Sequence, residues 1–154
     1  MASPESGACA GGGTSRIRSR RRLAAAVAAA VTVGAGLGLR AAMTGDVAKY
    51  GGDALYTLLI VALVVLVAPS VTARKAAAVA LALSWGVEFL QLSGVPAELS
   101  RHSVAARLVL GSTFGPQDLL WYTVGALGGW GLVAWSRRPV AGRAVTSRGR
   151  SLGR

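Results

Sequence analysis

The stretch Leu-Leu-Ile-Val-Ala-Leu-Val-Val-Leu-Val-Ala, at positions 58–68, contains no polar side chain. It is the centre of a longer apolar run over residues 54–73, and a helix needs about 20 such residues to cross roughly 30 Å of hydrocarbon. Similar runs occupy residues 23–39, 76–93 and 119–135. Four runs in one short chain leave no amphipathic partner that could cover them in water. We therefore predict an all-α fold, a bundle of four transmembrane helices.

The composition agrees with a membrane protein. Of the 154 residues, 53% are hydrophobic and 15% are charged, whereas a soluble domain usually carries about 25% charge. Seventeen Lys and Arg against six Asp and Glu give a net charge of +11, which on a soluble protein would favour nucleic acid. Here the basic residues border the apolar runs, so we expect membrane lipids as partners and no nucleic acid.

The basic residues also predict the orientation of the spans. Thirteen of them flank the runs on the side that holds both termini and the loop at residues 74–75. The other side has four, namely Arg40, Lys49, Arg101 and Arg107. Because Lys and Arg accumulate in cytoplasmic segments, we expect a multi-pass protein of the bacterial inner membrane with both termini in the cytoplasm.

The two ends of the chain are expected to lie outside the membrane domain, which we assign to residues 23–135. Residues 1–22 and 136–154 are rich in Arg, Gly and Ser, so we predict disordered basic cytoplasmic tails. One alternative stays open for the first run. Three arginines at positions 20–22 before an Ala-rich segment also resemble a signal peptide, whose cleavage would leave three spans. The exit at residues 38–42 has no clean cleavage site.

Polar residues gather at one depth of the predicted bundle, on the side away from the termini. Glu88 and Gln91 share a face of the third run. Glu88 lies about 8 Å from the outer end of that run. Acidic residues stand at the outer mouths of the second and fourth runs, and cations lie just outside. The predicted cluster consists of Lys49, Asp53, Glu88, Gln91, Arg107, Asp118 and Tyr122.

An intramembrane carboxylate costs several kcal/mol unless it is paired or protonated, and it marks a candidate functional site. Two interpretations of the cluster stay open and are compatible. One is a hydrogen-bonded network that holds the helices in register, and the other is a site for a headgroup, an ion or a proton. Asp118 follows Gly115 and Pro116, so we also expect it in the first turn of a helix, where a carboxylate suits the helix dipole.

The outer loop at residues 94–117 is the longest predicted connection. Within it, Leu99, Ala106 and Leu110 could form one face of a short interfacial helix. Small residues predict close helix packing in two runs. In the first run these are Ala30, Gly34 and Gly38, and in the fourth they are Gly125 and Gly129 with Gly128 beside them.

Catalytic and metal chemistry has little support. A single cysteine, Cys9, and a single histidine, His102, exclude an internal disulfide and a multi-histidine metal site within one chain. His102 lies beside Ser100 and Ser103, and adjacent residues cannot easily adopt triad geometry. We expect no catalytic residue, no metal and no cofactor.

Four short motifs follow one another in a distinctive order. They are Lys49-Tyr50-Gly51-Gly52-Asp53, Glu88-Phe89-Leu90-Gln91, Arg107 with Leu110-Gly111 and Phe114, and Asp118-Leu119 with Tyr122 and Gly125. Over residues 20–135 the chain resembles the bacterial domain-of-unknown-function 2809 family of small polytopic membrane proteins. The family has no established activity, so the resemblance implies a membrane architecture and leaves the function open.

A looser likeness is to VanZ-like membrane proteins, which are linked with teicoplanin resistance. They also show a Glu-x-x-Gln pair, here Glu88 and Gln91, and an Asp before a helix rich in small residues, here Asp118. Tyr122 stands where that family would have Asn, and this departure puts an antibiotic-linked function in doubt.

Three classes of function are compatible with this pattern. The leading expectation is a non-enzymatic envelope protein whose outward polar pocket binds a lipid or envelope-precursor headgroup or a partner protein. The second is a small proton- or cation-coupled transporter that uses Glu88 and forms a homo-oligomer. The third, an intramembrane enzyme acting on lipid phosphates, lacks a recognisable nucleophile or metal set.

Overall fold

The structure, a computed structural model, describes residues 12–110 and 114–138. Within these ranges every regular element is an α-helix, which confirms the all-α prediction. The helices are α1 (Gly12–Ala42), α2 (Asp46–Val67), α3 (Ala73–Gln91), α4 (Val95–His102), α5 (Val104–Leu110) and α6 (Asp118–Ser136).

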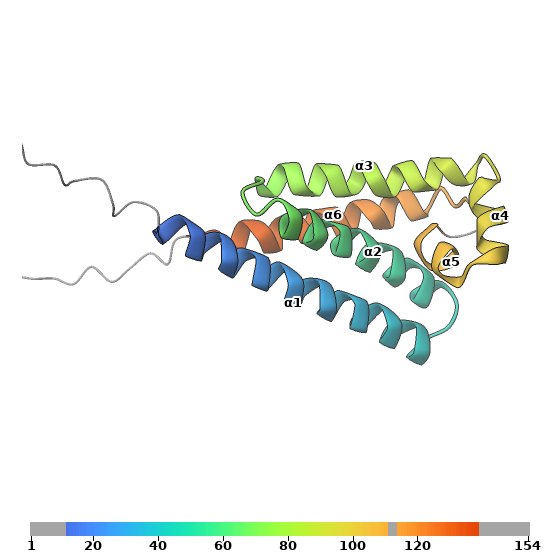
Figure 1. Cartoon of the computed structure of the whole chain (residues 1–154). Helices are drawn as coiled ribbons and strands as arrows, with labels where there is room; N and C mark the ends of the chain where they lie inside the picture. The colour runs from blue at the N-terminus through green and yellow to red at the C-terminus, as the bar shows by residue number, and fades with distance from the viewer. Residues whose placement is uncertain (1–11, 111–113, 139–154) are drawn as a thin grey trace, which may run out of the picture.

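Four long helices run up and down beside one another, and the two short helices lie at one end (Figure 1). Helix α2 is central, because it packs against α1, α3 and α6, while α3 also packs against α6. Among the helices of the described part, α1 packs against α2 alone. Helix α1 is therefore at the periphery of the bundle.

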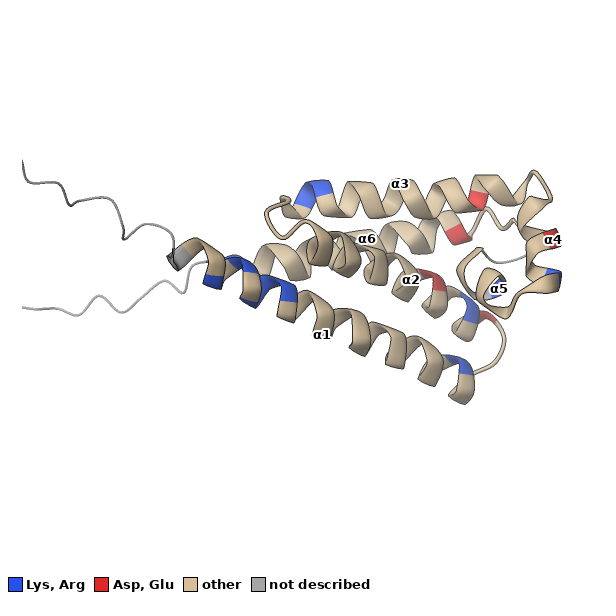
Figure 2. Ribbon diagram, viewed as in Figure 1, with Lys and Arg blue, Asp and Glu red and all other residues tan. Residues whose placement is uncertain are grey.

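The charges are separated along the bundle (Figure 2). The acidic residues of the described part all lie in the half that carries α4 and α5, namely Asp46, Asp53, Glu88, Glu98 and Asp118. The opposite end carries the arginines at the start of α1 and the basic pair at the start of α3. We call these halves the acidic end and the basic end.

By length and composition, two helices of the described part can cross a membrane, over Thr14–Ala42 in α1 and Asp46–Val67 in α2. A third candidate arises if α3 and α4, which meet at a bend of 90°, count as one broken span. Helix α6 is not among these candidates. The finding is thus a helical protein with two or three candidate membrane spans, fewer than the four predicted.

Several predicted boundaries were wrong. Helix α1 begins at Gly12, so the expected disordered tail is wrong for residues 12–22, where arginine, a strong helix former, continues the helix. The remaining tail residues, 1–11 and 139–154, lie outside the described part. Helix α2 begins at Asp46, eight residues before residue 54, and ends at Val67 just before Pro69.

The third run and the outer loop also differ from the prediction. Helix α3 begins at Ala73 because Thr72 caps it, its hydroxyl accepting a hydrogen bond from the Lys75 N–H. The loop holds two short helices where one was expected, and they are separated by Ser103 in an extended conformation. The glycine before α4, Gly94, has a φ of 75°, which favours glycine.

Small residues bring α2 and α6 into close contact. A Cβ atom added at Gly125 would collide with the carbonyl oxygen of Ala54, and one at Gly129 would lie 2.8 Å from a Val61 methyl group. The predicted packing face of the fourth run is therefore confirmed.

The predicted packing face of the first run was wrong. Gly34 and Gly38 have no atom within 4 Å of an added Cβ, and Ala30 is exposed. Helix α1 instead buries Ala25 and Thr32, which lie seven residues apart on one face. The four-residue spacing is present, but α2 contacts the other side of the helix.

Candidate functional site

Glu88 on α3 is the centre of the polar cluster, and its side chain is fully buried. One carboxylate oxygen, Oε1, accepts a hydrogen bond from the backbone N–H of Gly115 at 2.5 Å. The other, Oε2, accepts one from the Tyr122 hydroxyl at 3.1 Å. Glu88 thus ties α3 both to α6 and to the segment before it, and each bond offsets part of the cost of burying the carboxylate.

A second carboxylate pairs with a lysine across α2 and α6. The ammonium Nζ of Lys49 lies 3.0 Å from Oδ1 of Asp118. Asp118 is buried and occupies the first turn of α6, as the sequence predicted. Gly115 makes room for it, because an added Cβ there would lie 2.7 Å from an Asp118 carboxylate oxygen.

Asp53 and Gln91 each present a buried acceptor that has no partner within the described part. The Oδ2 atom of Asp53 makes no hydrogen bond, although the charges of Asp118, Lys49 and Glu88 all act on Asp53. Gln91 donates from Nε2 to the Leu110 carbonyl oxygen at 2.7 Å, while its Oε1 makes no hydrogen bond. The cluster therefore has three carboxylates against one lysine and two unused acceptors.

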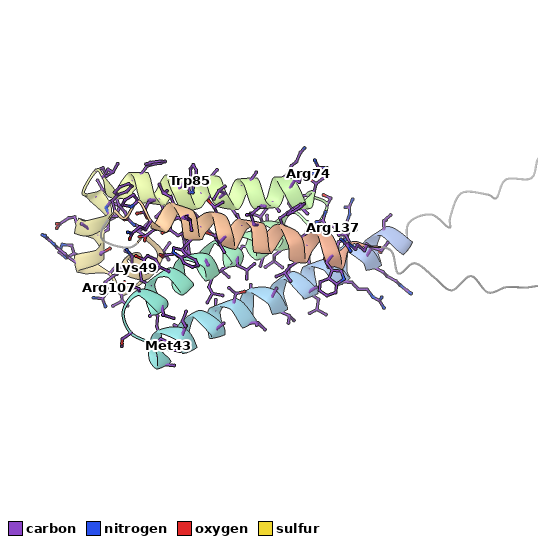
Figure 3. The ribbon with its side chains drawn as sticks, turned by 180° about the vertical axis from the view of Figure 1, so that it is seen from behind. Met43, Lys49, Arg74, Trp85, Arg107 and Arg137 are labelled. Atoms are coloured by element: carbon purple, nitrogen blue, oxygen red, sulfur yellow. The ribbon has the colours of Figure 1, made fainter. Side chains whose placement is uncertain are left out.

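Arg107 is the one predicted cluster residue that stands apart. Its side chain lies on α5, is exposed, and forms no ion pair with the described residues. Figure 3 shows Arg107 and Lys49 at the same end of the bundle. Lys49, and not Arg107, is the cation that the fold brings to the buried carboxylates.

Some contacts of the cluster were not predicted from the sequence. Thr57 and Ser84, both fully buried, share a hydrogen bond of 2.9 Å between α2 and α3. Their spacing was a usable signal, since Thr57 follows Asp53 by four residues and Ser84 precedes Glu88 by four. The amide of Gly115 carried no signal, because any residue has a backbone N–H.

Aromatic side chains close the same end of the bundle. The Tyr50 hydroxyl donates to Oε1 of Gln117 at 2.7 Å, and the Tyr50 ring stacks on Trp121 at 5.6 Å between centroids. Trp85 donates from Nε1 to the Leu119 carbonyl oxygen at 3.2 Å. These bonds join α2 and α3 to the start of α6.

The cluster in the described part is built from hydrogen bonds and one ion pair. Within the described ranges no group of three His, Cys, Asp or Glu residues could hold a metal ion. Two cavities, of about 480 and 210 Å³, are lined by α2, α3 and α6, and neither includes a carboxylate of the cluster. The predicted outward pocket is therefore not one of these two cavities.

The fold and the cluster define a small helical protein with membrane-compatible helices and a buried acidic centre. The family model described as protein of unknown function (DUF2809) matches residues 43–126. The chain belongs to this family, as its motifs predicted. The match contains all seven predicted cluster residues and leaves out α1. No curated protein and no solved structure matches the chain, and the likeness to VanZ-like proteins stays a prediction.

Proposed function

We propose that the chain is an integral protein of the bacterial inner membrane that crosses the bilayer four times, with both termini in the cytoplasm. Helices α3 and α6 have 19 residues each, or roughly 28 Å of helix, close to the hydrocarbon thickness of about 30 Å. The basic end then faces the cytoplasm, as the positive-inside rule requires. The acidic end with α4 and α5 faces the outer side of the membrane.

We further propose that the acidic end binds a hydrogen-bond donor group on the headgroup of a lipid or envelope precursor. The observation that carries this proposal is the buried Oδ2 of Asp53, an acceptor without a partner beside the Lys49–Asp118 pair. An unpaired buried acceptor costs about 1–3 kcal/mol, and a bound donor would remove this cost. Lys49, whose side chain is 48% exposed, offers a route from the surface to the buried carboxylates.

Proton or cation transport through Glu88 and Asp53 is the second candidate. It is favoured by the balance of three carboxylates against one lysine, since the surplus negative charge attracts a proton or a cation. A cation bound at Glu88 would compete with the Gly115 amide and the Tyr122 hydroxyl for the two carboxylate oxygens.

Reporter fusions test the topology. Fusions after Arg138 and in the loop at Arg74 should report cytoplasm, and a fusion at Glu98 should report the exterior, because thirteen basic residues then lie inside. A cytoplasmic signal at Glu98 would overturn the four-span arrangement.

A pair of matched variants tests the binding site. Asp53→Asn removes the unpaired carboxylate, while Asp46→Asn changes an exposed carboxylate on the same helix. Lipids copurifying with the full chain, identified by mass spectrometry, should lose one species in Asp53→Asn only. If both variants keep the wild-type lipids and Asp53→Asn stops proton flux in reconstituted vesicles, transport replaces headgroup binding.

A further inference from the structure

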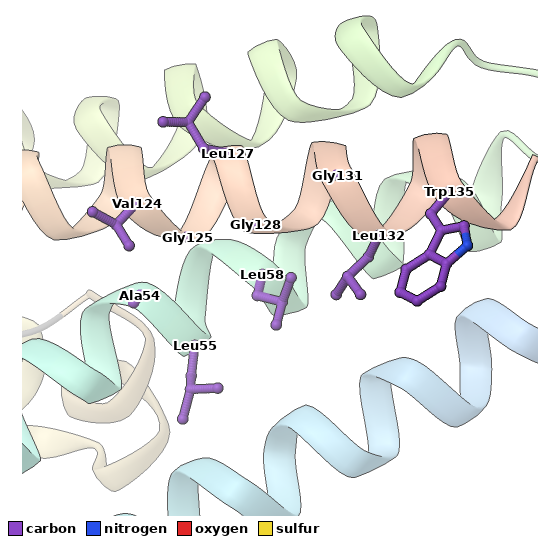
Figure 4. Close-up of a pocket in the computed structure, with 10 residues that line it drawn as sticks. All are labelled: Ala54, Leu55, Leu58, Val124, Gly125, Leu127, Gly128, Gly131, Leu132 and Trp135. Carbon is purple, nitrogen blue, oxygen red and sulfur yellow. The ribbon is translucent and has the colours of Figure 1, made fainter.

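An apolar groove runs along the bundle toward the basic end, away from the acidic cluster. Its volume is about 480 Å³, and its walls come from α2 and α6. Side chains of Leu55, Leu58, Leu132 and Trp135 point into the space between α6 and α1 (Figure 4). Gly128 leaves room within it, because no atom lies within 4 Å of a Cβ added there.

The length of the groove matches one leaflet of a bilayer. Along α6 its lining extends from Val124 to Trp135, which is about 16 Å of helix. Half of a hydrocarbon core of roughly 30 Å is about 15 Å. Trp135, at the basic end, is of the residue type that prefers the membrane–water interface.

Two arginines lie at the basic end, just beyond the residues that line the groove. Arg137 follows α6 directly, and its Nη2 atom is buried without a hydrogen-bond partner within the described part. Arg21 on α1 donates from Nη1 to the carbonyl oxygen of Pro69 at 3.3 Å, and its charge acts on Arg137. Burial, together with the Arg21 charge, lowers the pKa of Arg137, so an anion between the two side chains would relieve their repulsion.

No acidic residue of the described part lies at the basic end to supply that anion. Figure 3 shows Arg137 at the end of α6 close to α1. An occupant must therefore bring an apolar segment one leaflet long and a negative group at the cytoplasmic interface. A second copy of the chain would bring further arginines to the same place.

We propose that the groove binds one acyl chain of an anionic glycerophospholipid, whose phosphate lies between Arg21 and Arg137. The inference rests on the membrane placement proposed above and is independent of ligand binding at the acidic end. The reporter fusions test that placement separately, so a failure of the membrane placement can be distinguished from a failure of lipid binding in the groove.

Lipid binding can be measured by native mass spectrometry on the full chain after delipidation. The probes are phosphatidylglycerol and phosphatidylcholine, added at equal concentration. Wild type should bind phosphatidylglycerol about 25-fold more tightly, since each of the two basic contacts near the surface contributes about fivefold. Equal binding of the two lipids would overturn the anionic site.

Matched variants separate the acyl chain from the phosphate. Gly128→Leu should weaken binding of both lipids roughly tenfold by filling the groove, whereas Gly86→Leu on α3, also in open space, should not. Arg137→Gln should lower the preference for phosphatidylglycerol to about fivefold, the share of Arg21, and leave phosphatidylcholine unchanged. Arg18→Gln, an exposed charge on α1, should keep the preference.

The melting temperature and the oligomeric state of each variant are measured as well. If Gly128→Leu lowers the melting temperature of the lipid-free protein, Gly131→Leu, which also lines the groove in open space, takes its place. Unchanged lipid binding by a folded groove variant would overturn the proposal. A folded groove variant that loses a dimer while keeping its lipid adducts would assign the groove to a second copy.

Discussion

The same three helices, α2, α3 and α6, pack in different ways at the two ends of the bundle. At the acidic end Glu88, Asp118 and Lys49 join them through hydrogen bonds and an ion pair. Toward the basic end the contacts are apolar or small, with Val61 against Gly129 and a buried Ala76.

The two ends show that a short chain can combine close packing of its helices with a set of buried polar bonds. Helices in lipid have no hydrophobic drive toward one another, so they associate through close packing of small residues and through polar bonds. Small residues let the helix backbones approach closely, and the polar residues supply both cohesion and a surplus of acceptors. Removing polar contacts and a small-residue contact in separate variants should separate these contributions.

Glu88→Ala should produce the largest loss of stability. The change leaves the Gly115 amide and the Tyr122 hydroxyl without their shared acceptor, and hydrogen bonds to a charged group contribute about 1.5–3 kcal/mol each. We expect the free energy of unfolding in mixed detergent micelles to fall by about 3 kcal/mol. Glu88→Gln keeps the shape and one acceptor, so it should cost less.

The control is Glu98→Ala. Glu98 is exposed and, among the described residues, its ion pairs are with Arg101 and His102 on its own helix. The change should therefore alter the free energy of unfolding by no more than about 0.5 kcal/mol. If Glu88→Ala and wild type have the same free energy of unfolding, Glu88 does not stabilise the acidic end.

Gly125→Ala should have the next largest effect, at the small-residue contact between α2 and α6. The new Cβ would collide with the backbone of Ala54, and overpacking of this kind costs about 2 kcal/mol. Gly128→Ala on the same helix meets open space, so it should leave the unfolding free energy unchanged or raise it. If both variants unfold alike, the close approach of the two helices is not part of their stability.

Lys49→Gln should cost about 1 kcal/mol. Asp118 is buried and would lose its cation, but water screens a pair whose lysine side chain is 48% exposed. Lys75→Gln, at the exposed start of α3, is the matched control. A salt titration sharpens the test, because high salt should shrink the difference between Lys49→Gln and wild type.

Thr57→Val should have the smallest effect of the four changes. It removes the hydrogen bond to Ser84 while keeping the branched shape, and such bonds between membrane helices average about 0.6 kcal/mol. The free energies of unfolding of Thr57→Val, Ser84→Ala and the double variant give the coupling free energy between the two hydroxyls. Strict additivity would contradict a direct bond.

Much of this architecture was predictable, because local patterns suffice for it. Apolar runs predicted the long helices, and the first-turn position of Asp118 followed from the residues before it. Residue spacing predicted the close contact at Gly125 and Gly129. In each case the neighbours that decide the outcome are close in the sequence or lie on one helix face.

Other features depend on neighbours far apart in the sequence. Lys49 and Arg107 were equal candidates for the buried carboxylates, and only the path of α5 leaves Arg107 outside. Likewise, the spacing of Gly34 and Gly38 suits helix packing, and so does the spacing of Ala25 and Thr32. Helix α2 lies against Ala25 and Thr32. A periodicity defines the faces of a helix and does not say which face meets a partner.

The sequence by itself determined the helical class, the family and the separation of acidic from basic residues, because these depend on composition and local order. The tertiary structure alone decided that the Gly115 amide and the Tyr122 hydroxyl satisfy Glu88, and that Oδ2 of Asp53 keeps no partner. It also brought Arg21 and Arg137 close enough for their charges to interact. The physical reason is that a hydrogen bond or an ion pair needs atoms within a few ångströms, and only the packed helices set those distances.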